Sequence, residues 1–252
     1  MQITLKKSLG QHFLKDENIL HNIIAALQKH HFERLLEIGP GAGALTKYLL
    51  QLENIDFKAI ELDQEKIDYL LTHYPALKDK IIHEDFLKAS IPFNEAFIVI
   101  GNFPYNISSQ ILFKILEWKE KVPVVIGMFQ KEVAQRIASK PNNKSYGILS
   151  VLVQAFYDVQ YLFDVSPSCF KPPPKVMSGV IELKIRNEKL KIKNEEVFFR
   201  LVKAAFNQRR KKLRNAVRNL FDENILSDAI FDKRAEQLSI EDFAALSFKT
   251  KS

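Results

Sequence analysis

The fold is indicated by one continuous stretch, which reads Phe97-Ile98-Val99-Ile100-Gly101-Asn102-Phe103-Pro104-Tyr105. Its first five residues form an apolar run that is rich in β-branched side chains and ends in glycine, which is typical of a buried strand in an α/β sheet. Ligands bind just beyond the carboxyl ends of strands in such sheets. Residues 102–105 are therefore expected to stand at a binding site.

Residues 102–105 combine three groups that suit an aromatic amine. The amide oxygen of Asn102 can accept a hydrogen bond from an exocyclic amine. Pro104 lacks an N–H and stiffens the turn, which leaves a backbone carbonyl free to face a ligand. Tyr105 offers a flat face on which a base can stack. The turn predicts a grip on an amine such as N6 of adenine, although an ordinary strand-to-helix turn would show the same short motif.

Composition places the chain among soluble globular proteins. Its 252 residues, with 46% hydrophobic and 27% charged side chains, are enough for one large domain and a small one. The only cysteine is Cys169, so no internal disulfide can form, and a cytoplasmic location is expected. No run is long and apolar enough for a membrane span or signal peptide, and the histidines lack metal-ligand spacing, so neither a membrane partner nor a metal is expected.

Strand-like and helical segments alternate through the first part of the chain. This alternation predicts a mainly parallel, doubly wound sheet. Two later strands, at 159–165 and 179–185, are joined by a proline-rich connection and are expected to be antiparallel at a sheet edge. The earlier expected strands lie at residues 35–38, 57–61, 81–82, 97–101 and 122–129, and expected helices include residues 18–29 and 111–116.

The positive charge is concentrated near the C-terminus. Residues 186–252 contain 16 Lys and Arg against 10 Asp and Glu, a net charge of +6, out of +7 for the chain. This segment is also expected to be all helical from about residue 195. We therefore predict two domains, residues 1–188 and residues 189–252, the second with an anionic partner such as a nucleic acid.

Three features on successive strands predict a pocket for an adenosine. A glycine-rich turn at 37–43 follows the first strand and allows close approach of a ligand to the backbone. Glu61 closes the second strand, where it can accept both ribose hydroxyls. Asp85 follows the third, where it can accept from the adenine amine. A phosphate loop motif is absent, and a nicotinamide dinucleotide would leave Asp85 and residues 102–105 unexplained, whereas S-adenosylmethionine fits every feature.

The motifs resemble those of the rRNA adenine N6-dimethyltransferases of the KsgA type. The resemblance is collinear and runs over about residues 4 to 221. The matching segments are 8–14, 37–43, 60–63, Asp85, 102–108, 130–133, 170–176 and 208–211.

The resemblance implies an α/β fold, a Rossmann-like S-adenosylmethionine-dependent methyltransferase sheet with a small all-helical C-terminal domain. It also implies methylation of two adjacent adenines in the 3′-terminal hairpin of 16S rRNA, within the small ribosomal subunit or its precursor, by a monomer. His12 stands where the family usually carries asparagine, and Phe103 where leucine is more usual. The implied cofactor-binding residues are His12, Leu14, Gly39, Glu61, Asp85 and Asn102.

The expected chemistry is mainly positioning. The Asn102 side-chain oxygen and the Pro104 carbonyl would draw the N–H bonds of the target amine out of plane, so that its lone pair faces the methyl donor. The target base must leave its stack to reach the pocket, and Tyr105 and Phe170 are expected to sandwich it.

A basic stretch is expected to bind the RNA. Residues 200–218 contain eight Lys and Arg and no acidic residue. Like charges placed one turn apart on a helix repel, and a phosphate backbone would relieve that repulsion. A merely solvated basic face is the alternative, and Lys6 and Lys7 could extend the surface. The candidate RNA-binding residues are Arg209, Arg210, Lys211, Lys212 and Arg214.

Other functions remain open from the residues. A methyltransferase of the antibiotic-resistance type, acting on 23S rRNA, would share the cofactor motifs and the turn at 102–105. A non-catalytic nucleic-acid-binding or assembly factor could be built on the same fold. A nicotinamide oxidoreductase is a more distant alternative, which the absence of hydride transfer would dismiss.

Overall fold

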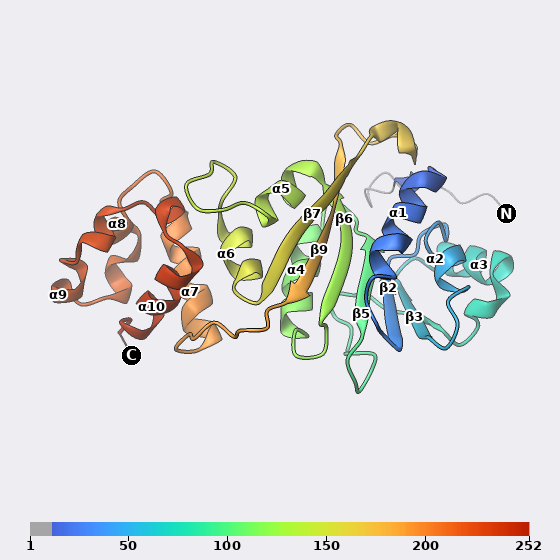
Figure 1. The fold of residues 1–252 in the computed structure, drawn as a ribbon, viewed down its shortest axis with the longest axis horizontal. Helices are drawn as coiled ribbons and strands as arrows, with labels where there is room; N and C mark the ends of the chain where they lie inside the picture. Colours follow the sequence, from blue (N-terminus) through green and yellow to red (C-terminus); the bar gives the residue numbers. More distant parts are fainter. Residues whose placement is uncertain (1–11, 252) are drawn as a thin grey trace. The chain divides into compact units, whose positions relative to one another are not determined.

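The computed structural model describes residues 12–251, and the chain divides into two compact units (Figure 1). The first unit comprises Met1–Ala134 and Gln160–Ile185, and the second comprises Gln135–Val159 and Arg186–Ser252. The charge pattern predicts a single division after residue 188. The structure differs in grouping residues 135–159 with the C-terminal segment, because a helix in that stretch packs on the first C-terminal helix.

The first unit is organised around a seven-stranded sheet with the strand order β4-β3-β2-β5-β6-β9-β7. Neighbouring strands from β4 to β6 are parallel, whereas β9 is antiparallel to β6 and β7 forms the edge. This is the predicted Rossmann-like α/β architecture. The strands are β2 (Arg34–Ile38), β3 (Asp56–Glu61), β4 (Ile81–His83), β5 (Ile98–Asn102), β6 (Val124–Gln130), β7 (Tyr157–Val165) and β9 (Ser178–Ile185).

Helices cover this sheet, and α1 (Glu17–Leu27) shows why they form. The Asp16 side chain caps α1 by accepting hydrogen bonds from the Asn18 and Ile19 backbone N–H groups. Its apolar stripe, including Leu20 and Leu27, is buried in the sheet core, and Figure 1 shows α1 in front of the central strands. The remaining elements are β1 (Phe13–Leu14), which pairs with β8 (Phe170–Lys171), α2 (Thr46–Leu49), α3 (Gln64–His73), η2 (Pro75–Leu77), α4 (Ser108–Glu117), α5 (Lys131–Ile137) and η3 (Pro167–Cys169).

Strand register places the site residues at one edge of the sheet. Ile38 of β2 is paired with Ile60 of β3, and Glu37 with Ile100 of β5. Because these strands are parallel and in step, the segments that leave their carboxyl ends emerge side by side. The glycine turn and the acidic and amide side chains are therefore brought together by the sheet itself.

The second unit is helical. Asn194 caps α7 (Glu195–Asn207) by accepting from the Val197 N–H at 2.8 Å, and the apolar stripe of α7, including Phe198, is buried. Within residues 12–251, no helix has the length and apolar character to cross a membrane. The other elements are α6 (Ile148–Gln154), α8 (Leu213–Val217), η4 (Arg218–Leu220), α9 (Glu223–Leu226), η5 (Ala229–Asp232), η6 (Ala235–Gln237) and α10 (Ile240–Phe248).

Candidate active site and basic turn

The glycine turn after β2 meets the carboxylate that ends β3. Gly39, Gly41 and Gly43 have φ angles of +66°, +60° and +82°, a left-handed backbone that glycine adopts without strain. The Gly41 N–H donates to Glu61 Oε2 at 3.3 Å, and a side chain at Gly43 would collide with Tyr74. The turn is therefore bent toward Glu61, and its path requires glycine.

The Glu61 carboxylate is held in a fixed orientation. Its Oε1 accepts from the Leu62 and Asp63 N–H groups, each at 3.0 Å, and lies 3.8 Å from the buried Lys66 ammonium. Glu61 is only 5% exposed, so these donors stabilise a charge that burial would otherwise penalise. A hydroxyl-bearing ligand would meet a preoriented acceptor here.

The turn at the end of β5 presents two oxygen acceptors. The Asn102 amide Nδ2 donates to the His12 carbonyl at 3.1 Å, and this bond leaves Oδ1 as the acceptor end of the amide. The Pro104 carbonyl accepts from the Ile107 N–H at 3.2 Å. The expectation that this carbonyl is free is therefore wrong in part, because the turn into α4 uses one of its two lone pairs and leaves the second for a ligand.

Tyr105 is fixed by contacts at both ends. Its hydroxyl and the Ser178 Oγ are 2.5 Å apart, and burial raises the pKa of the phenol, so it remains neutral at physiological pH. The His12 ring lies with its centroid 5.6 Å from that of Tyr105, at an angle of 31°. His12 Nδ1 is also 2.9 Å from the Pro172 carbonyl. This packing defines which face of Tyr105 a base can occupy.

Two cavities adjoin at this edge of the sheet. The first, about 700 Å³ and open to solvent, brings together residues from β1, the glycine turn and the turn after β5. The second is lined by Asp85 and by the apolar side chains of Phe86, Ile107 and Ile111, a wall that suits a planar base. Both are lined by Gly39, Glu61, Lys66 and Pro104, and the first also by His12, Leu14, Asn102 and Tyr105. All the predicted cofactor-binding residues therefore line one continuous region.

Phe170 departs from expectation. It is 2% exposed, lies in the hydrophobic core of the first unit and pairs with Leu14 through β8 and β1. It lines neither cavity. The prediction that it sandwiches the base with Tyr105 is wrong for this conformation, because the β1–β8 pairing turns its ring into the core.

Two residues of the pocket were not singled out by the sequence reasoning. Glu37, at the end of β2, is 2% exposed and accepts from Thr46 Oγ1 at 2.7 Å; burial raises its pKa to about 8, with the hydrogen bond opposing and Glu61 adding to that effect. Lys66 lies on α3, a helix whose pattern gives no sign that one lysine points inward. A charged residue inside an apolar strand was the available signal for Glu37.

The basic stretch does not form one helix. Helix α7 ends at Asn207, Gln208 has φ −121° and ψ 50°, and α8 begins only at Leu213, whose N–H donates to the Lys233 carbonyl at 2.7 Å. The prediction of a continuous helix is wrong, because the chain leaves the helical conformation at Gln208 and the start of α8 is fixed by this contact with a later segment. We call residues 209–214 the basic turn.

Three of the five candidate cations in the basic turn have acidic partners. Arg209 Nε is 2.6 Å from Glu236, while Lys212 and Arg214 lie 2.7 and 2.9 Å from Asp232. The hydrogen bond from Lys212 lowers the pKa of Asp232. Within residues 12–251, no ion pair is formed by Arg210 or Lys211, and both are exposed.

Two further expectations concern the N-terminal segment and metal binding. Lys6, Lys7 and most of the motif at 8–14 lie outside the described residues. In the part of the chain from residue 12 to 251, no group of three or more His, Cys, Asp or Glu side chains is arranged to hold a metal ion.

Comparison with known proteins shows which family this chain matches. The family model described as "Ribosomal RNA adenine dimethylase" matches residues 2–250. The chain is 53% identical over 246 residues to "Ribosomal RNA small subunit methyltransferase A" of Cytophaga hutchinsonii, covering 96% of this chain and 95% of that one. It is 52% identical to the protein of the same name from Flavobacterium johnsoniae, covering 100% and 97%.

Solved structures agree with the fold. A dimethyladenosine transferase from Plasmodium falciparum matches with a TM-score of 0.78 and 26% identity, covering 92% of this chain and 94% of that one. The 23S rRNA methyltransferase ErmE matches with a TM-score of 0.69 and 21% identity, covering 92% and 99%, which shows a shared fold.

Proposed function

The chain belongs to the ribosomal RNA adenine dimethylase family, and we propose that it transfers methyl groups from S-adenosylmethionine to two adjacent adenines in the 3′-terminal hairpin of 16S rRNA. Membership of this family makes the chain an S-adenosylmethionine-dependent rRNA methyltransferase. The products would be N6-dimethyladenosines formed during assembly of the small subunit. We further propose that the protein works in the cytoplasm as a monomer that binds the small subunit or its precursor.

One observation carries this proposal. The turn that holds Asn102 and Tyr105 opens onto the same cavity as the glycine turn and Glu61. Groups suited to an amine and groups suited to an adenosine cofactor therefore share one space, as transfer between the two requires.

The residues present fit S-adenosylmethionine. Gly39 has a positive φ, and a side chain there would extend into open space 4.0 Å from the Pro104 ring, where a ligand can approach the backbone. Glu61 offers its carboxylate to the ribose hydroxyls, and Asp85 offers a carboxylate to the adenine amine beside the apolar wall. His12 and Leu14 complete the side formed by β1. When bound, S-adenosylmethionine supplies an electrophilic methyl group.

The protein's task is to orient the target amine. The N6 lone pair of adenine is delocalised into the ring, so the amine is a poor nucleophile. Asn102 Oδ1 and the second lone pair of the Pro104 carbonyl can each accept one N–H of this amine and hold it out of the ring plane. Tyr105 supports the base through its exposed ring face.

No strong base is needed in this scheme. The nitrogen becomes acidic once it is alkylated, so its proton can pass to water while Asn102 and the Pro104 carbonyl act only as hydrogen-bond acceptors. The monomethylated amine retains one N–H for a second transfer, which uses a fresh cofactor molecule. Positioning can then supply several kcal/mol of barrier reduction.

The test incubates labelled S-adenosylmethionine with purified undermethylated small subunits and, separately, with deproteinised 23S rRNA, followed by nucleoside analysis. We expect labelled N6-dimethyladenosine at two adjacent positions of 16S rRNA. Label only in deproteinised 23S rRNA would instead identify an enzyme of the resistance type. Binding of cofactor and subunits without any transfer would identify a non-catalytic assembly factor.

A further inference from the structure

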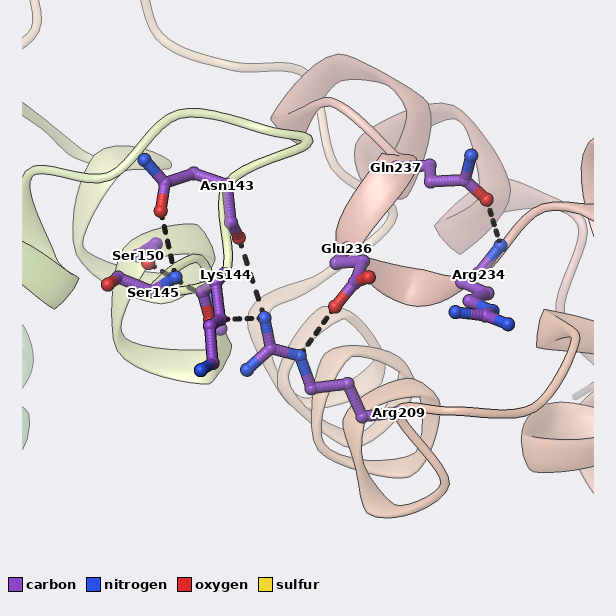
Figure 2. A network of polar contacts seen from close by, with 9 residues as sticks. Asn143, Lys144, Ser145, Ser150, Arg209, Arg234, Glu236 and Gln237 are labelled. Atoms are coloured by element: carbon purple, nitrogen blue, oxygen red, sulfur yellow. Dashed lines mark hydrogen bonds and ion pairs between the residues drawn. The ribbon is translucent and has the colours of Figure 1, made fainter.

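The Arg209 side chain is engaged within the second unit. Its Nε donates to Glu236 Oε2 at 2.6 Å, and its Nη2 donates to the backbone carbonyls of Asn143, at 3.4 Å, and Lys144. Figure 2 shows the guanidinium between the Glu236 carboxylate and the backbone at 143–145. One planar fork thus joins three chain segments that are distant in the sequence.

The loop at 141–146 is fixed by further contacts. The Asn142 N–H donates to the Glu236 carbonyl at 2.8 Å, and Asn142 has φ +65°. Asn143 accepts from the Ser145 N–H at 2.9 Å and, through its carbonyl, from the N–H of the buried Tyr146 at 3.0 Å. The Glu236 carbonyl therefore binds the loop directly, and the Glu236 carboxylate binds Arg209, which in turn binds the loop.

Glu236 is itself held in place. It lies in η6 (Ala235–Gln237), and the Gln237 side chain accepts from the Arg234 N–H at 2.8 Å, which closes this short helix (Figure 2). The loop is thus attached to an ordered element.

The attachment brings additional positive charge to the basic turn. Lys144 is exposed, and its backbone lies within one arginine side chain of Arg209, next to the exposed Arg210 and Lys211. Like charges gathered in this way repel, and the structure supplies no acid to Lys144, Arg210 or Lys211 within residues 12–251. Phosphates of an RNA backbone would relieve that repulsion and release counterions.

We propose that Arg209 is a positioning residue, which holds the 141–146 loop so that Lys144, Arg210 and Lys211 form one phosphate-binding surface. This inference rests on the proposed function, because it takes the phosphates from the rRNA. It assigns the direct contacts with phosphate to Lys144, Arg210 and Lys211, and it assigns no such contact to Arg209. Lys144 then belongs to the RNA-binding surface although no charge run in the sequence contains it.

The assignment is tested by substitutions whose effects differ in direction. Lysine keeps the charge of arginine but cannot donate along two edges, so Arg209→Lys should weaken binding to purified undermethylated small subunits as much as Arg209→Gln does. Glu236→Gln should also weaken binding, because it loosens the loop. A direct contact between Arg209 and phosphate predicts the reverse: Arg209→Lys would bind almost normally, and Glu236→Gln would bind more tightly.

Lys144 provides a test that does not depend on Arg209 variants folding. Lys144→Gln should make the slope of log affinity against log salt shallower by roughly 0.7–0.9, the value for one phosphate contact. In an Arg209→Gln background the same change should add little, because the loop is already displaced. An unchanged slope for Lys144→Gln overturns the proposal.

A matched control separates this from general loss of charge. Lys191→Gln removes one exposed lysine before α7, at the opposite end of that helix from Arg209, and should leave the slope unchanged. Thermal unfolding and S-adenosylmethionine affinity of each variant exclude global damage. If the parent protein binds and methylates small subunits while Lys144→Gln and Arg209→Lys behave like it, only this inference fails; if the parent does not bind them at all, the proposed function fails with it.

Discussion

The proposed cofactor pocket of the first unit and the basic turn of the second unit differ in how the residues of each are distributed along the sequence. The pocket gathers side chains from His12 to Tyr105, which are far apart in the chain, around one cavity. The basic turn takes neighbours in the chain, residues 209–214, and pairs Arg209 with Glu236 but both Lys212 and Arg214 with Asp232. The order of strands in a parallel sheet thus predicts which side chains meet in space, whereas a run of like charges does not predict which partner each side chain will have.

The physical reason lies in what fixes each region. In the pocket, the register of β2, β3 and β5 is set by a buried ladder, so the positions past the strand ends are determined. In the basic turn, each side chain can reach any acid within its length, and the acids Asp232 and Glu236 come from a later segment. We expect the pocket to respond to single substitutions much more strongly than the turn.

The largest effect is expected at Asn102. Replacing Asn102 with alanine removes the side-chain acceptor for the target amine and should slow methyl transfer by about 10²–10³, the usual loss for one preorganised polar group. Single-turnover measurements with small subunits and saturating cofactor would give this rate. Transfer at the parent rate would refute the amine-holding mechanism.

Tyr105→Phe is the matched control for Tyr105→Ala, which removes the stacking surface. It keeps the ring face and loses only the hydroxyl that lies 2.5 Å from Ser178. We expect a much smaller decrease in rate than for Tyr105→Ala, and both variants should still bind S-adenosylmethionine.

Much of the pocket could be predicted from the sequence, for reasons that the structure makes explicit. Gly39, Glu61, Asp85 and Asn102 each lie at or just past the end of a strand whose apolar run is readable, so their placement needed only the rule for parallel sheets. The predicted stacking role of Phe170 is wrong because the position of its ring depends on a two-residue pairing between β1 and β8, which no sequence pattern indicates. Lys66 was missed because a buried lysine on a polar helix has no local signal.

The basic turn was harder to predict. The cluster of cations was plain, yet its break into two helices depends on tertiary contacts such as the Leu213 N–H to the Lys233 carbonyl. The 141–146 loop reads as an ordinary polar turn, and its attachment to Glu236 joins positions more than 90 residues apart by their numbers. A count of charges along the sequence cannot predict long-range hydrogen bonds of this kind.

The second prediction concerns Glu61. Glu61→Ala should weaken S-adenosylmethionine binding by roughly 1.5–3 kcal/mol, because a charged acceptor for the ribose hydroxyls is lost. Isothermal titration would measure it, with Glu53→Gln as the control, since Glu53 is exposed and carries the same charge. Unchanged affinity in a folded Glu61→Ala variant would remove Glu61 from the cofactor site.

The third prediction uses the opposite electrostatics of the two regions. Burial raises the pKa of Glu37 in the pocket to about 8, whereas Lys212 lowers that of Asp232 in the turn. With Glu37 the folded state retains a proton that the unfolded chain releases near its ordinary pKa of 4.5. The stability that this proton contributes is complete at low pH and is lost as the pH rises toward and through the folded pKa.

The free energy of unfolding should therefore fall as the pH rises from 6.5 to 8, by on the order of 1–2 kcal/mol from Glu37. Urea unfolding at several pH values would show this slope. Glu37→Gln, which keeps the shape and cannot ionise, should flatten it. An equal slope in the parent and in Glu37→Gln would mean that Glu37 is already ionised when folded.

The smallest expected effects distinguish side chains within the basic turn. Arg210→Gln with Lys211→Gln removes two exposed cations that form no ion pair with any acid between residues 12 and 251, and should make the salt slope for binding small subunits shallower by about two phosphate contacts. Lys212→Gln with Arg214→Gln removes the same charge, but these side chains are held by Asp232, so the slope should change less. The second pair should instead lower the unfolding temperature slightly, as expected for surface ion pairs. Equal slopes for the two pairs of variants would mean that pairing with acids does not keep Lys212 and Arg214 from binding phosphate, and that the turn binds RNA through its total charge alone.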